Sequence, residues 1–127
     1  MITALYASIC ALLLMKLSIA VIKLRRKHHV SLGDGNVDAL KTAIGVHSNA
    51  SQYIPISLLL IFLLEQNQAN IWLIHITGLA LVTGRFLHAH GMWNKMSARV
   101  LGMQITIYNI VALSVLNLLF LPYSQLI

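Results

Sequence analysis

The stretch that decides the fold spans residues 36–65 and reads NVDALKTAIGVHSNASQYIPISLLLIFLLE. Its first half is rich in polar residues, and its second half, from residue 56 onward, is apolar apart from Ser57. The pattern fits one long helix and no strand. At about 100° per residue, one face carries an amide-bearing stripe about 80° wide, formed by Thr42, Gly45, Asn49 and Gln52. Polar groups at bilayer depth are costly unless they face a protein interior or a wet cavity, so this stripe marks a candidate site.

The composition indicates a membrane protein. Of the 127 residues, 58% are hydrophobic and only 9% are charged, whereas a soluble domain carries about 25% charged residues. Apolar runs cover residues 2–24, 53–64 (extended backward by the polar half-helix), 69–87 and 100–121. Each can reach the roughly 20 residues that a bilayer helix needs. We predict an all-α membrane protein in which residues 1–127 form a single domain, a four-transmembrane-helix bundle.

The net charge of +6 is unevenly distributed along the chain. Basic residues follow the first apolar run at 23–27 and flank the third connection at 85–99, whereas the second connection, around residues 65–70, has no Lys or Arg. The positive-inside rule then places the first and third connections in the cytoplasm and both termini outside. The basic cluster is best explained by topology and contact with anionic lipid, and nucleic acid is not expected as a partner.

Three features need tertiary structure to interpret. Lys16 interrupts the first apolar run, and either its stem snorkels toward the headgroups or its charge faces a neighbouring helix or a bound anion. Gly33-Asp34-Gly35 predicts a turn, because Gly supplies positive φ and Asp tolerates it. Asn36 is expected to cap the second helix.

Several polar side chains converge toward the predicted cytoplasmic side. Arg85 and His88 share a helix face, and Arg99 opens the fourth helix. Arginine offers a fixed fork of donors, which suits a carboxylate- or thiolate-bearing ligand, while the apolar bundle suits a lipophilic molecule. The alternative is that the amides of the stripe only join helices by hydrogen bonds. His88 and His90 do not share a face and no acidic or cysteine ligand is near, so no metal site is predicted.

The order of these motifs resembles the MAPEG family, the membrane-associated proteins of eicosanoid and glutathione metabolism. The motifs are the basic first connection with Gly33-Asp34-Gly35, then His47-x-Asn49-x-x-Gln52-Tyr53-x-Pro55, then Gly84-Arg85-x-x-His88-x-x-Gly91, then Arg99. The resemblance covers nearly the whole chain, and the residues before the second helix resemble those of the small bacterial inner-membrane branch.

The resemblance implies a homotrimer with sites between subunits and glutathione as a co-substrate. It implies that Arg99 is catalytic, because a cation beside a thiol stabilises the thiolate. Six residues would bind glutathione: Lys41, Asn49, Gln52, Tyr53, Arg85 and His88.

The chain departs from the family pattern at charged positions. Gln52 replaces a glutamate that pairs the glutathione amine, and Gly45 replaces an arginine, for which Lys41 can substitute in part. The helix-three tyrosine positions hold His88 and Met92. Two functions therefore stay open. One is a glutathione-dependent transferase or peroxidase acting on a lipophilic electrophile. The other is a non-catalytic trimeric membrane module that binds a lipid, a small anion or a protein partner.

Overall fold

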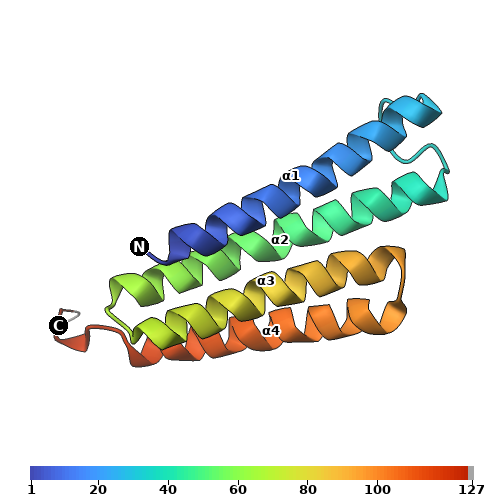
Figure 1. Cartoon of the computed structure of the whole chain (residues 1–127). Helices are drawn as coiled ribbons and strands as arrows, with labels where there is room; N and C mark the ends of the chain where they lie inside the picture. Colours follow the sequence, from blue (N-terminus) through green and yellow to red (C-terminus); the bar gives the residue numbers. More distant parts are fainter. Residues whose placement is uncertain (126–127) are drawn as a thin grey trace.

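The computed structural model describes residues 1–125, which form four long helices packed side by side (Figure 1). The helices are α1 (Thr3–His28), α2 (Asp38–Gln66), α3 (Ile71–Trp93) and α4 (Met96–Leu119), followed by a short 3₁₀ helix η1 (Tyr123–Gln125). All four long helices have the length and apolar composition needed to cross a membrane. The predicted all-α, four-transmembrane-helix bundle is confirmed.

Two helices continue well beyond the apolar runs that reveal them in the sequence. α1 extends through the basic residues to His28, and α3 extends past Leu87 to Trp93. Hydropathy marks only the part of a helix that suits lipid, whereas the backbone hydrogen bonds continue until the chain changes conformation. In α1 that change is the left-handed conformation of His29, with φ 55°, whose N–H donates to the carbonyl oxygen of Arg25.

The first connection turns as predicted but caps α2 differently. Gly33 and Gly35 have positive φ angles of 66° and 56°. The predicted N-cap role of Asn36 is wrong, because α2 begins at Asp38 and its N-cap residue is Val37. The Val37 side chain makes no capping hydrogen bond. Asn36 itself lies in the turn with φ 57°, and its backbone N–H donates to Asp34 Oδ1 at 2.9 Å. Asn36 thus occupies a left-handed position of the turn, which asparagine tolerates. It therefore lies one residue before the N-cap position of α2.

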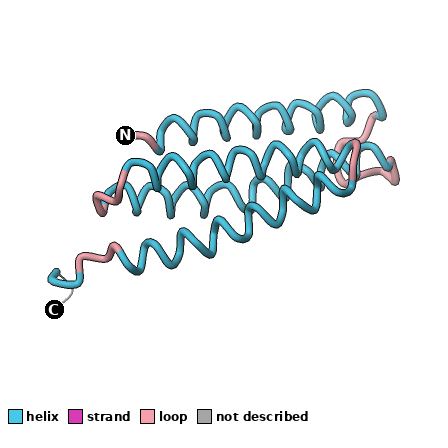
Figure 2. The backbone as a smooth tube through the Cα atoms, turned by 60° about the horizontal axis from the view of Figure 1, so that its bottom comes forward, coloured by secondary structure: helices cyan, strands magenta, loops and turns pink. Residues whose placement is uncertain are grey.

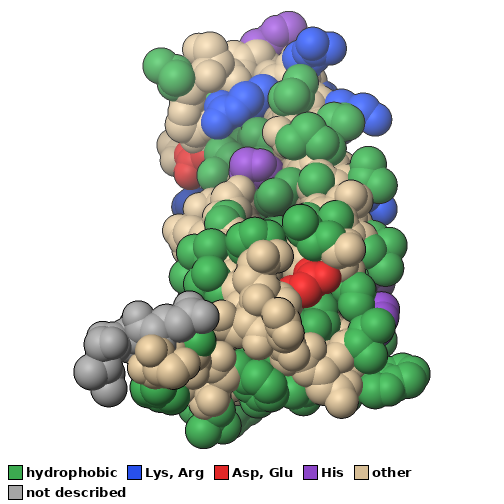
Figure 3. Space-filling model, turned by 90° about the vertical axis from the view of Figure 1, so that its left-hand side faces the viewer, with side chains coloured by type: hydrophobic (Ala, Val, Ile, Leu, Met, Phe, Trp, Pro, Cys, Tyr) green, Lys and Arg blue, Asp and Glu red, His purple; other side chains and the backbone are tan. Residues whose placement is uncertain are grey.

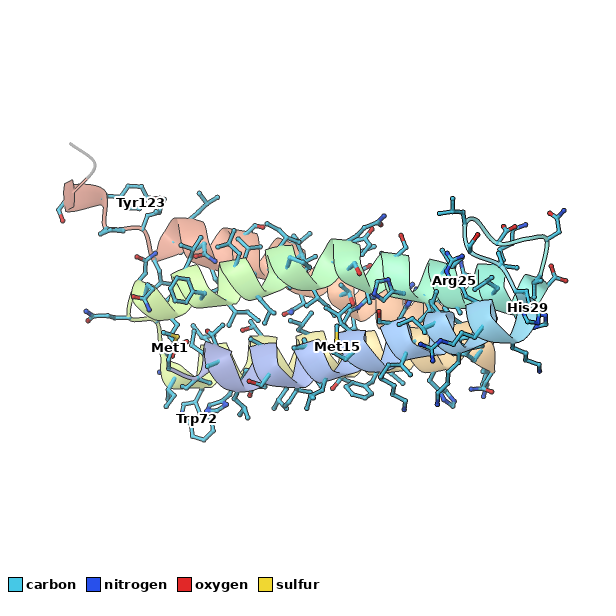
Figure 4. The ribbon with its side chains drawn as sticks, turned by 90° about the horizontal axis from the view of Figure 1, so that it is seen from above. Met1, Met15, Arg25, His29, Trp72 and Tyr123 are labelled. Atoms are coloured by element: carbon cyan, nitrogen blue, oxygen red, sulfur yellow. The ribbon has the colours of Figure 1, made fainter. Side chains whose placement is uncertain are left out.

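The basic residues gather at one end of the bundle. Figures 1 and 2 show the α1–α2 and α3–α4 connections at that end, with the N-terminus, the α2–α3 connection and η1 at the other. Figure 4 shows Arg25 and His29 at the first end and Met1 and Trp72 at the opposite one. In the space-filling view, hydrophobic side chains cover much of the visible face, and Lys and Arg lie toward its upper part (Figure 3). The first and third connections therefore lie at one end of the bundle and the N-terminus lies at the other, as the predicted topology requires.

Helices α3 and α4 approach each other closely because three glycines lie between them. A Cβ atom on Gly91 would meet the backbone of Arg99, and one on Gly102 would meet the backbone of His88 and of Gly84. Small residues at such contacts let membrane helices pack backbone against backbone. This packing sets the register of the two helices that carry Arg85, His88 and Arg99.

Glu65, near the end of α2, caps the beginning of α1. Its carboxylate accepts hydrogen bonds from the backbone N–H groups of Ile2 and Thr3 and from the Thr3 hydroxyl. The first N–H groups of a helix have no partner within it, and the positive end of the helix dipole favours a carboxylate. The contact therefore anchors α1 against α2 at the end of the bundle away from the basic residues.

We expect Glu65→Ala to destabilise the bundle by about 1 kcal/mol, the typical cost of a lost helix cap. The measurement is thermal unfolding in detergent, followed by circular dichroism. Gln66→Ala is the matched control, because Gln66 is the next residue and is exposed. An equal drop in both variants would show that the cap contributes nothing of its own.

Candidate functional site

Arg85 is the buried centre of the candidate site, with only 1% of its surface exposed. Its Nε donates to Thr106 Oγ1 at 3.1 Å, and its Nη1 donates to Asn49 Oδ1 at 2.7 Å. Its Nη2 contacts Met103 Sδ at 3.7 Å, and the guanidinium carbon lies 5.5 Å from the centre of the Tyr53 ring. The guanidinium of α3 thus joins α2 to α4.

The partners on α4 follow from the spacing of that helix. Arg99, Met103 and Thr106 are four and three residues apart, which places them on one face. The Thr106 hydroxyl donates to the carbonyl oxygen of Gly102 at 2.9 Å, so its oxygen lone pairs remain to accept from Arg85. Met103 and Thr106 are additional residues of the site that residue type alone did not predict, although their spacing from Arg99 is the signal that could have identified them.

No carboxylate neutralises the charge of Arg85 within residues 1–125. The chain has three acidic residues: Asp34 and Asp38 lie at the first connection, and Glu65 binds the start of α1 at the other end. The one ion pair in the described part of the chain joins the N-terminal amine to Glu65 at 4.0 Å. Arg85 is therefore held by neutral acceptors and an aromatic ring, and it leaves a positive potential around the site.

A cavity of about 380 Å³ lies beside this network, between α2, α3 and α4. Its polar lining consists of Asn49, His88, Arg99 and Gln104, and its apolar lining consists of Val100, Met103 and Ile107. His88 is 5% exposed, whereas Arg99 is exposed and its Nη1 contacts only the sulfur of Met96, at 3.5 Å, within the described chain. The cavity therefore combines a free guanidinium with an apolar wall.

The structure brings most of the predicted site residues together. Asn49, His88 and Arg99 line the same cavity, while Arg85 and Tyr53 lie behind it. Lys41 and Gln52 are exposed on α2 and do not line the cavity of their own chain. The ligand-binding roles given to six of these residues, and the catalytic role given to Arg99, stay predictions.

Comparison with known proteins agrees with this architecture. Residues 3–119 match the sequence profile of the MAPEG family. The chain is 40% identical over 125 residues to the inner membrane protein YecN of Escherichia coli strain K12, and the match covers 98% of this chain and 95% of that protein. The inner membrane protein YecN of Escherichia coli O6:H1 strain CFT073 matches to the same extent. With four membrane-length helices and a family match over nearly its whole length, this chain belongs to the MAPEG family.

Proposed function

We propose that this protein is a multi-pass protein of a bacterial inner membrane that binds an anionic amphiphile in the cavity between α2, α3 and α4. The observation that carries the proposal is the buried guanidinium of Arg85, which has no carboxylate partner in residues 1–125. A buried cation with only neutral partners favours an anion nearby. The exposed guanidinium of Arg99 offers donors to that anion, and Val100 and Ile107 contact its apolar part.

This assignment favours a non-catalytic binding module. Two residues that match glutathione ligands of the family, Arg85 and Asn49, bind each other at 2.7 Å. Gln52 and Gly45 stand where the family pattern has a glutamate and an arginine, so two charged contacts to glutathione are missing. Ligand binding without catalysis therefore requires fewer changes to the observed contacts than glutathione transfer does.

Glutathione-dependent transfer to a lipophilic electrophile, or peroxide reduction, is the second candidate. It is favoured by Arg99, whose guanidinium lines the cavity with free donors. There it can stabilise the thiolate of glutathione, the nucleophilic form of the co-substrate. His88 and Gln104 would then orient the peptide part of glutathione.

A homotrimer with the basic end in the cytoplasm completes the proposal. Lys41 and Gln52 are exposed on α2 and do not line the cavity of their own chain, so an adjacent subunit is the route by which they can contribute to a site. The orientation follows from the basic residues of the first and third connections, since positively charged connections are retained in the cytoplasm.

The test compares binding of oleate, an anionic amphiphile, with binding of oleyl alcohol, its neutral counterpart, to the purified protein in detergent by native mass spectrometry. We expect the wild type to prefer oleate and Arg99→Ala to bind oleate about tenfold more weakly, because a charge-assisted hydrogen bond is lost. Arg26→Ala is the control, since Arg26 is an exposed arginine outside this cavity. Equal retention of oleate and oleyl alcohol by the wild type would overturn the proposal.

Calorimetry with glutathione separates the two candidates. Saturable binding that weakens in Arg99→Ala and tightens in Gln52→Glu would support a glutathione site that lacks one contact. Absence of binding to the wild type at millimolar glutathione would exclude the transferase and leave the binding module.

A further inference from the structure

A second hollow, of about 310 Å³, lies between α1 and α3. Its polar rim is formed by Lys16, His90, Trp93 and Asn94, and its apolar floor includes Leu13 and Phe86. It shares no lining residue with the cavity that contains Arg99. The proposed function leaves this hollow unexplained.

The hollow brings Lys16 together with residues at the end of α3. In the sequence Lys16 interrupts a long apolar run, far from the basic end of α1. In the structure it lines one hollow together with Trp93, the last residue of α3, and Asn94, the C-cap of that helix. Tryptophan at the end of a membrane helix is typical of the bilayer interface. The four-carbon stem of Lys16 can therefore carry its ammonium group toward the headgroups on the α3 side of α1.

The charge of Lys16 is unpaired within residues 1–125, where the one ion pair involves Glu65. A lysine at this depth interacts favourably with an anionic lipid headgroup. The rim adds donors suited to phosphate oxygens, namely the indole N–H of Trp93 and the amide of Asn94. The Asn94 amide already donates to the carbonyl oxygen of His90 at 3.2 Å, which holds it beside the rim.

A second lysine strengthens the preference for negative charge. Lys23 lies seven residues after Lys16, on the same face of α1, and the two line a neighbouring groove together with Met15 and Ile19. A lipid with a net negative charge would be attracted by both ammonium groups, whereas a zwitterionic lipid brings its own cation to the same place. Leu13 and Phe86 precede Lys16 and Trp93 along their helices and so lie farther from the basic end, which is the direction an acyl chain takes from its headgroup.

We propose that the hollow between α1 and α3 binds an anionic phospholipid, with its phosphate at Lys16, Trp93 and Asn94 and an acyl chain along Leu13 and Phe86. The site takes a phosphodiester that carries a hydrophobic chain in preference to free phosphate, because half of its lining is apolar and only the chain can contact it. It is separate from the Arg99 cavity, so it can hold a lipid whether or not that cavity binds a ligand.

The experiment titrates the purified protein in detergent with phosphatidylglycerol and with phosphatidylcholine of the same acyl chains, and counts bound lipid by native mass spectrometry. We expect the wild type to bind phosphatidylglycerol about fivefold more tightly than phosphatidylcholine, and Lys16→Gln to lose this preference. Lys16→Arg keeps the charge and should keep the preference. Lys27→Gln, the same charge change elsewhere on α1, should also keep it.

Three outcomes would overturn the proposal. They are a preference that survives in Lys16→Gln, an equal loss in Lys27→Gln, and displacement of phosphatidylglycerol by inorganic phosphate. Circular dichroism of each variant establishes that the bundle is folded, and Lys16→Arg reports on the site independently of Lys16→Gln. Arg99→Ala removes phosphatidylglycerol bound in the Arg99 cavity, and the preference for phosphatidylglycerol that remains in this variant should be lost when Lys16→Gln is added, so a failure of the anionic amphiphile site is distinguishable from a failure of this one.

Discussion

Asn49→Ala should lower the free energy of unfolding by about 3 kcal/mol, the largest effect we expect of any single polar substitution in this chain. The Asn49 Oδ1 atom accepts the shortest hydrogen bond of the Arg85 guanidinium, at 2.7 Å. Without it, a buried cation loses its strongest acceptor, and the other partners of Arg85, a hydroxyl and a thioether, are weaker. The measurement is thermal or denaturant-induced unfolding in detergent.

A double-mutant cycle identifies the cause of this loss. Asn49→Ala combined with Arg85→Leu should be more stable than Asn49→Ala alone, because the apolar side chain removes the unpaired buried charge. Gln52→Ala is the matched control, since Gln52 is an amide on the same stripe of α2 but is exposed. If Gln52→Ala were as destabilising as Asn49→Ala, the hydrogen bond to Arg85 would not be the reason.

Gly102→Ala should lower the free energy of unfolding by about 3 kcal/mol as well, at the upper end of the usual cost of overpacking. A Cβ atom at this position would lie against the backbone nitrogen of His88 and the carbonyl oxygen of Gly84. Backbone atoms cannot rotate away as a side chain can, so α3 and α4 must move apart. This separation would also displace Thr106, whose hydroxyl bonds to the Gly102 carbonyl and to Arg85.

Gly45→Ala is the control for this substitution. A Cβ atom at Gly45 would have only the terminal methyl of Met92 within reach, at 3.6 Å, which is an ordinary contact. Alanine is the better helix former by about 1 kcal/mol, so Gly45→Ala should leave the protein as stable or make it more stable. The measurement is thermal unfolding of both variants in one detergent. If Gly102→Ala were as well tolerated as Gly45→Ala, the close packing of α3 and α4 would be contradicted.

The candidate site was predictable in part. Arg85, His88 and Arg99 were identified from their residue types and spacing, and the structure does bring His88 and Arg99 to one cavity beside Arg85. The different surroundings of the two arginines were not predictable. Arg85 is buried and bound to neutral partners, whereas Arg99 is exposed with free donors. In the sequence, both arginines lie near the ends of apolar runs. Only the rotation of each helix relative to its neighbours makes one arginine buried and the other exposed.

The sequence by itself determined the number of membrane helices, their approximate ends and the concentration of positive charge at one end of the bundle. These properties depend on local composition, because each helix must match the bilayer and satisfy its own backbone hydrogen bonds. Only the tertiary structure decided that Lys16 shares a hollow with Trp93, that Glu65 caps α1, and that Lys41 and Gln52 do not line the cavity of their own chain. Those facts depend on how α1, α2 and α3 pack side by side and how far they are shifted along one another. Contacts such as Gly78 against Tyr6 help to set this packing, and helical periodicity within one segment does not encode it.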